Sequence, residues 1–179
     1  MIRFLSAIIL FLSLTFFEVQ PILGGNIETY YGPEGDLQER MISLYETAGK
    51  SIYISCYNIT SRPIVKTLIK AKKKGIDVKV ITDSGELENK NTRHAVKALL
   101  NAGIPVKINR HEGLMHIKQV VIDDAVNTTG SFNQTWSANN LNDERLDIIS
   151  DRTNSRKAKD KFLSMWNDQE RFKDLKENF

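Results

Sequence analysis

The stretch of sequence that decides the fold reads MHIKQVVIDDAVNTTGSFN over residues 115–133. Two apolar runs, 114–122 and 125–132, lie on either side of the pair Asp123-Asp124. Apolar runs of strand length around a pair of turn-forming residues predict two strands joined by a tight turn. We therefore expect a β-hairpin in the second half of the chain.

This hairpin carries a set of chemically useful side chains. Residues two apart on a strand point to the same face of the sheet, so His116 and Lys118 should share a face, as should Ser131 and Asn133. If the strands pair, one face presents an imidazole, an ammonium, a hydroxyl and an amide. An anionic tetrahedral group such as a phosphodiester requires such a set. Asp123 should face the other way, at the turn, and orient or anchor the hairpin.

Strand-like and helix-like stretches alternate along the rest of the chain. Further strands are expected at 27–31, 52–57, 76–82, 106–108 and 146–149, and helices at 37–49, 61–75, 91–102 and 154–178. Ser61 and Pro63 form a typical helix start, with the serine as N-cap and the proline in the first turn. Together these elements predict an α/β fold with a mixed β-sheet flanked by helices on both faces.

Composition excludes several classes of protein. The chain has 179 residues, 41% hydrophobic and 26% charged, as expected for one globular domain, and its net charge of +3 does not by itself indicate a nucleic-acid ligand. The single cysteine, Cys56, is expected to be a small core residue. The chain lacks HExxH, CxxC, GxGxxG and P-loop patterns, so we expect no metal and no other cofactor. The acidic residues Asp83, Glu86 and Glu88 are expected in a solvated loop, with a metal site there as the alternative.

Residues 1–24 differ from the remainder. Arg3 precedes an apolar run over 4–17, which as a helix would span about 21 Å at roughly 1.5 Å per residue. The hydrocarbon core of a bilayer is about 30 Å thick. We therefore expect residues 1–24 to be a cleaved export signal, with an uncleaved membrane anchor as the alternative, and 25–179 to be the functional domain. The protein should then be exported, periplasmic or secreted, or tethered to a membrane.

The hairpin stretch also carries six residues at fixed spacing: His116, Lys118, Asp123, Gly130, Ser131 and Asn133. This pattern resembles the HKD motif of the phospholipase D superfamily, and most of all the small bacterial endonucleases that carry the motif once. Glu144 lies where that family has a downstream acid. Gln134 stands where the family often has an aromatic residue, with Trp136 two positions further on, a departure that leaves the chemical groups intact.

The resemblance implies a phospholipase D-like fold and a role for each motif residue. The candidate catalytic residues are His116, Lys118, Asp123 and Glu144, and the candidate phosphate-binding residues are Lys118, Ser131 and Asn133. His116 would attack phosphorus and form a covalent phosphohistidine, while Lys118 and Asn133 hold the non-bridging oxygens. Ser131 would support that pocket. Glu144 would accept the Nδ1 proton of His116 and leave Nε2 free to attack. The family needs no metal.

The mechanism that the resemblance implies needs two histidines, although the motif occurs once. His94 and His111 lack the HxK context. The simplest solution is a homodimer in which each chain donates one motif to a shared site.

The leading functional hypothesis is a nonspecific, metal-independent endonuclease that cleaves DNA or RNA. Candidates for additional phosphate contacts are Arg93, Lys97, Arg110 and Arg152. The alternatives are a hydrolase of phospholipids such as cardiolipin and a nucleic-acid-binding module without turnover.

Overall fold

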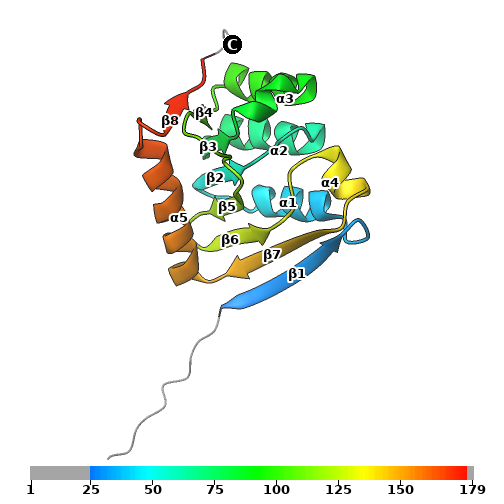
Figure 1. Cartoon of the computed structure of the whole chain (residues 1–179). Coiled ribbons are helices and arrows are strands. Elements are labelled where there is room, and N and C mark those ends of the chain that lie inside the picture. Colours follow the sequence, from blue (N-terminus) through cyan, green and yellow to red (C-terminus); the bar gives the residue numbers. More distant parts are fainter. Residues whose placement is uncertain (1–24, 177–179) are drawn as a thin grey trace, which may run out of the picture.

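The chain folds around one eight-stranded sheet, in a computed structural model that describes residues 25–176 (Figure 1). In spatial order the strands are β1 (Asn26–Gly32), β7 (Glu144–Ser150), β6 (Val126–Gly130), β5 (Lys118–Ile122), β2 (Ser51–Cys56), β3 (Asp77–Thr82), β4 (Val106–Asn109) and β8 (Phe172–Asp174). Strands β2, β3 and β4 are parallel, and every other neighbouring pair is antiparallel. The predicted mixed sheet is therefore confirmed.

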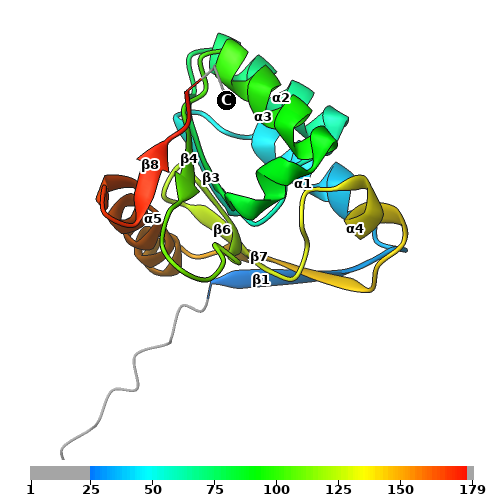
Figure 2. The same cartoon turned by 45° about the horizontal axis from the view of Figure 1, so that its top comes forward.

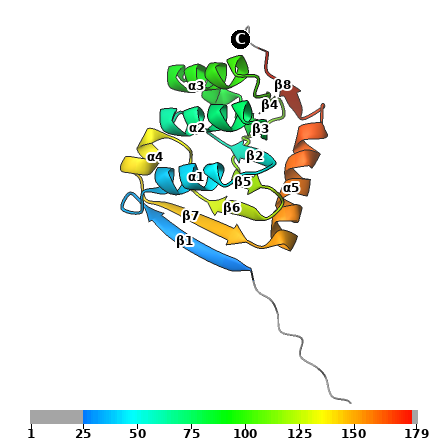
Figure 3. The ribbon, with the colours of Figure 1, turned by 180° about the vertical axis from the view of Figure 1, so that it is seen from behind.

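Helices cover both faces of the sheet, as predicted (Figure 2). Three of them, α1 (Leu37–Glu46), α2 (Arg62–Lys73) and α3 (Lys90–Asn101), lie side by side on one face (Figure 3). Their buried side chains, such as Leu68 and Leu99, share the larger core with Ile54. On the other face, α5 (Arg152–Asn167) forms a smaller core in which Phe162 stacks on Tyr53 at 5.0 Å between ring centroids.

Local sequence explains the start and end of α2. The Ser61 hydroxyl accepts a hydrogen bond from the Ile64 backbone N–H at 3.3 Å, and Pro63 lies in the first turn. The helix ends just before Gly75, whose φ of +89° is easily adopted by a residue without a Cβ. The predicted N-cap and the predicted end of this helix are both confirmed.

The chain segments that carry the motif residues meet at one end of the strands, along the side of the sheet that is formed by strand ends. Parallel β2, β3 and β4 end there, and antiparallel β5 begins there, because Cys56 pairs with Lys118. Strand β6 ends and β7 begins at the same edge, because Gly130 pairs with Leu146. We call it the motif edge. Ligand sites in sheets with parallel strands lie outside the carboxyl ends of those strands.

The prediction of a helix over 154–178 is wrong for residues 168–176, and its last two residues lie outside the described part of the chain. The Asp168 carboxylate accepts the backbone N–H groups of Glu170 and Arg171 at 3.1 and 2.9 Å, which turns the chain. Phe172, 2% exposed, then begins β8 beside β4. Short elements at 85–88 (the 3₁₀ helix η1, Gly85–Glu88) and 136–140 (α4, Trp136–Asn140) were also not predicted.

The predicted signal or anchor segment, residues 1–24, lies outside the described residues. Within 25–176, no helix has both the length and the apolar character that crossing a membrane requires. Strand β1 begins at the edge opposite the motif edge, because Asn26 pairs with Ser150 at the end of β7.

Candidate active site

The structure brings four of the motif residues to the motif edge, but not by strand alternation. His116 lies in an irregular segment before β5, and only Lys118 is in the strand. Ser131 and Asn133 come after β6 has ended. The expectation that they alternate along one hairpin face is therefore wrong. They converge because β5 begins and β6 ends at the same edge.

A buried carboxylate holds the segment that carries His116. Asp83, 1% exposed at the end of β3, accepts hydrogen bonds from the backbone N–H groups of Met115 at 2.7 Å and Gly85 at 2.9 Å. The expectation of a solvated acidic loop is thus wrong for Asp83, whose burial is matched by these bonds. The alternative has no support either, because residues 25–176 contain no group of three or more potential metal-binding side chains.

The His116 imidazole and the Lys118 ammonium lie against the same aromatic ring. The ring centroids of His116 and Tyr57 are 4.8 Å apart, with the planes tilted by 60°. The Lys118 Nζ lies 5.0 Å from the centroid of the Tyr57 ring and donates to the His116 carbonyl at 3.0 Å. His116 itself is exposed, so a cation and an accessible imidazole lie side by side.

Lys118 is half-buried, and its pKa depends on two opposing effects. Burial disfavours the ammonium and lowers the pKa of Lys118, while the Cys56 thiol and the carboxylates of Glu144 and Glu86 oppose this effect. The net pKa is below the ordinary value. A cation in this environment interacts with a phosphate oxygen more strongly than a solvated one does.

The exposed Ser131 and the buried Glu144 form a hydrogen-bonded pair near this cation. The Ser131 hydroxyl donates to Glu144 Oε2 and accepts the Arg145 backbone N–H at 3.1 Å. The other carboxylate oxygen, Glu144 Oε1, accepts from the Asn142 amide at 3.1 Å. Within residues 25–176 these are the side-chain partners of Glu144, so the expected hydrogen bond from His116 to Glu144 stays a prediction.

Gly130 and Asn133 complete the segment after β6. Gly130 has a φ of +139°, and a Cβ there would lie 2.0 Å from the Arg145 carbonyl oxygen, so only glycine fits. The Asn133 Oδ1 is buried without a hydrogen-bond partner among the described residues. A buried amide oxygen without a hydrogen-bond partner is an unusual feature in a native fold.

Comparison with known proteins identifies the family. Residues 41–166 match the family described as "Cardiolipin synthase, PLD-like domain". The chain belongs to the phospholipase D superfamily. It is a phosphodiesterase of that superfamily.

Solved structures and sequence relatives agree with this assignment. The fold is similar to that of Nuc from Salmonella typhimurium, a phospholipase D family member, with a TM-score of 0.79 and 27% identity, covering 85% of this chain and 99% of that one. NucT from Helicobacter pylori shares the fold at a TM-score of 0.72 and 23% identity, covering 79% and 96%. Phospholipase D of Rickettsia prowazekii is 29% identical, covering 86% of this chain and 72% of that protein. Mitochondrial cardiolipin hydrolase of Xenopus tropicalis is 27% identical, covering 71% and 60%.

The Asp123 of the superfamily motif lies away from the other motif residues in this phosphodiesterase. It follows β5 at the end opposite Lys118, in the turn, with a φ of +51°. Its carboxylate accepts the backbone N–H groups of Gly49, Lys50 and Ser51 at 2.6 to 2.8 Å. Burial alone would raise the pKa of Asp123, but these bonds outweigh it and lower the pKa. Asp123 therefore anchors the turn to the start of β2 and touches no reacting group.

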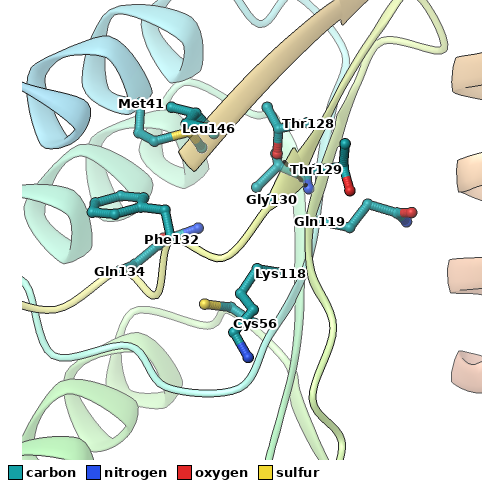
Figure 4. A pocket seen from close by; sticks show the side chains of 11 residues that line it. Met41, Cys56, Lys118, Gln119, Thr128, Thr129, Gly130, Phe132, Gln134 and Leu146 are labelled. Atoms are coloured by element: carbon teal, nitrogen blue, oxygen red, sulfur yellow. Dashed lines mark hydrogen bonds between the residues drawn. The ribbon is translucent and has the colours of Figure 1, made fainter. Parts of the chain in front are cut away.

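Gln134, the departure from the superfamily pattern, points into the protein and not toward substrate. Its Nε2 donates to the Tyr45 hydroxyl at 2.7 Å, and the Gln134 backbone carbonyl accepts the backbone N–H groups of Thr60 and Ser61. Gln134 lines a small cavity of about 10 Å³ behind the motif, together with Lys118 and the buried Cys56 (Figure 4). Burial raises the pKa of the Cys56 thiol to about 11, consistent with the predicted core role.

Three of the four candidate basic residues occupy different positions in the structure. Arg110 follows β4 at the motif edge. Arg93 donates to the carbonyl oxygens of Leu87 and Glu88 at 2.6 and 2.9 Å, so it holds a loop. Arg152 begins α5 just after β7 ends, at the opposite edge, so it lies away from the motif residues.

Sequence reasoning did not find every residue of the site. Tyr57, Asp83 and Glu86 all surround His116 or its neighbours, and none was proposed to support it. Tyr57 and Asp83 follow directly after the ends of β2 and β3. Polar and aromatic residues just after predicted parallel strands were the available signal, because such strand ends share one edge of the sheet.

Proposed function

We propose that the protein is a metal-independent endonuclease that cleaves DNA or RNA without sequence preference. The observation that carries the proposal is the exposed His116 imidazole beside the half-buried Lys118 ammonium, at the edge that also holds Ser131 and Asn133. The single motif in its spacing also resembles that of small bacterial endonucleases. The similarity to Nuc over nearly its whole length supports this choice.

The proposed reaction proceeds by two displacements. The His116 Nε2 forms a bond to phosphorus while the bond from phosphorus to the leaving oxygen breaks, which gives a phosphohistidine. A second imidazole protonates the leaving oxygen and then takes a proton from water, whose oxygen attacks phosphorus and releases His116. Lys118 and the Asn133 amide stabilise the charge on the non-bridging oxygens.

We propose that the second imidazole is the His116 of another copy of this chain. A twofold dimer that joins two motif edges supplies both histidines to one site. Export through residues 1–24 also stays a proposal, since those residues lie outside the described part of the chain.

The test uses the purified protein and a His116→Ala variant with single-stranded DNA, plasmid and RNA, in excess EDTA. Cleavage by the wild type alone is the expected result, and the preferred polymer names the substrate. Because phosphate contacts dominate affinity, cleavage should weaken as salt rises. Equal cleavage by the variant, or loss of cleavage in EDTA that added metal restores, would contradict the proposal. Binding by both proteins without cleavage would point to a module without turnover.

A second candidate is the hydrolysis of phospholipids. The relatives named "Phospholipase D" and "Mitochondrial cardiolipin hydrolase" suggest it. So do three exposed apolar side chains in segments next to the motif residues, Leu114, Trp136 and Leu141, exposed by 59%, 63% and 66%. Tryptophan and leucine in such a position suit a membrane interface. Hydrolysis of cardiolipin in vesicles, with DNA and RNA left intact, would decide for this function.

A further inference from the structure

Tyr57 contacts both of the groups that the reaction needs, although it is not part of the motif. It follows directly after β2, and its ring packs against the His116 imidazole with 4.8 Å between centroids. The same ring carries the Lys118 ammonium at 5.0 Å. In the described part of the chain, no hydrogen bond to the imidazole of His116 is present, so ring packing is what orients it.

The Tyr57 hydroxyl lies in a polar, acidic environment. The Glu86 carboxylate, together with burial, raises the pKa of Tyr57 to about 12, so the phenol stays neutral near pH 7. Glu86 also accepts from the Asn58 amide, and the Asn58 Oδ1 accepts from the Thr92 hydroxyl at 3.1 Å. These bonds join Asn58, the residue after Tyr57, to η1 and to helix α3.

We propose that Tyr57 is a positioning residue for the phosphodiesterase reaction, with its ring fixing the relative positions of the His116 imidazole and the Lys118 ammonium. The proposal rests on the proposed function in one respect, that His116 is the nucleophile. The electron-rich face of an aromatic ring attracts an ammonium while leaving its N–H groups free for a phosphate. A displacement of about 1 Å in such a constellation can reduce the rate by about 100-fold.

The chain offers a matched control in Tyr30 on the edge strand β1. Its hydroxyl donates to Glu28 at 2.6 Å, and the Arg40 guanidinium lies 4.5 Å from its ring centroid. The two tyrosines thus have the same kinds of partner and similar partial burial. Strands β7 and β6 separate β1 from β5, so Tyr30 lies away from the His116–Lys118 pair.

The experiment measures kcat and KM of the full protein with bis(p-nitrophenyl) phosphate, a small phosphodiester that has neither bases nor acyl chains. Tyr57→Leu should lower kcat/KM by about 10- to 100-fold, the scale expected for misplaced catalytic groups. Tyr57→Phe keeps the ring and should stay within about threefold of the wild type, which is rescue by the conservative variant. Tyr30→Leu should leave kcat/KM unchanged. Thermal unfolding of all variants separates lost activity from lost folding.

The possible failures are distinguishable. If His116→Ala is as active as the wild type, the proposed function is wrong. If His116→Ala is inactive but Tyr57→Leu keeps wild-type kcat/KM, only the role of Tyr57 is wrong.

Should Tyr57→Leu not fold, proton NMR of the wild type and of Tyr57→Phe provides the second test. The chain has three histidines, so His116→Ala assigns the resonances of His116. Ring packing predicts His116 signals displaced by the aromatic ring current in both proteins. Signals at solvent-exposed positions would overturn the proposal.

Discussion

At the scale of single residues, the pKa of Lys118 depends on groups that lie far from it in sequence. Burial lowers its pKa, and among the opposing groups the Glu144 and Glu86 carboxylates come from β7 and η1. Glu144 is also hydrogen-bonded to Ser131, whereas Glu86 is bonded to Asn58. The two carboxylates therefore both raise the pKa of Lys118, although they come from different parts of the fold.

Glu86→Gln should move the alkaline limit of activity to lower pH. Glu86 raises the pKa of Lys118, so removing its charge lowers that pKa further, and the ammonium that binds phosphate is lost at lower pH. The measurement is the pH dependence of kcat/KM. Glu88→Gln, an exposed acid in the same 3₁₀ helix, is the control and should not shift the profile. An unmoved limit in Glu86→Gln, or an equal shift in both variants, would contradict this assignment.

At the scale of secondary-structure elements, the end of β6 must pass very close to β7. Gly130 pairs with Leu146, and the Ser131 N–H donates to the Arg145 carbonyl at 3.0 Å. The close approach of these two backbones places Ser131 against Glu144. Gly130 thus allows β6 and β7 to pair closely, and the neighbouring Ser131 donates a hydrogen bond to Glu144 in the site.

Gly130→Ala should therefore destabilise the protein severely. A Cβ would lie 2.0 Å from the Arg145 carbonyl oxygen, on a residue whose φ is +139°, so β6 and β7 would have to separate. Gly75→Ala is the matched control, since its φ is +89° but nothing lies within 4 Å of a Cβ there. Strain alone costs about 1 kcal/mol, and urea unfolding should show a much larger loss for Gly130→Ala. Similar losses in the two variants would show that the close approach is not real.

At the scale of the whole molecule, the proposed reaction needs a histidine that this motif does not supply. The other two histidines, His94 and His111, lie in α3 and in the loop after β4. His111 packs against Phe172 with 5.5 Å between ring centroids, and its Nδ1 lies 2.6 Å from the Glu112 carbonyl oxygen. Those contacts place His111 in the loop beside β8, so a second copy is the simpler source of the acid.

Mixing wild-type and His116→Ala chains tests the shared site. If two copies complete one site, random exchange at equal amounts should reduce the activity per wild-type chain to about half, because only dimers of two wild-type chains are complete. Independent sites would leave the activity per wild-type chain unchanged. Light scattering on the same samples reports the mass, and an active monomer would end the dimer proposal.

Sequence alone determined the parts of this protein that depend on contiguous residues. The spacing from His116 to Asn133 led to the family, and apolar periodicity located most strands and helices. Ser61 and Pro63 marked the start of α2 for the same reason, since a helix cap involves only its first turn. Such features can be predicted because backbone periodicity and capping are local.

Only the tertiary structure decided how the site is supported. Residues 57, 83, 86 and 116 come from three segments, after β2, after β3 and before β5, and the parallel order of β2 and β3 beside antiparallel β5 brings them to one edge. Because of this packing, Asp83 is buried, and strand β8 stands where the sequence predicted the end of the last helix. His116 likewise lies outside the predicted strand. These outcomes depend on contacts between residues far apart in sequence, which local periodicity does not contain.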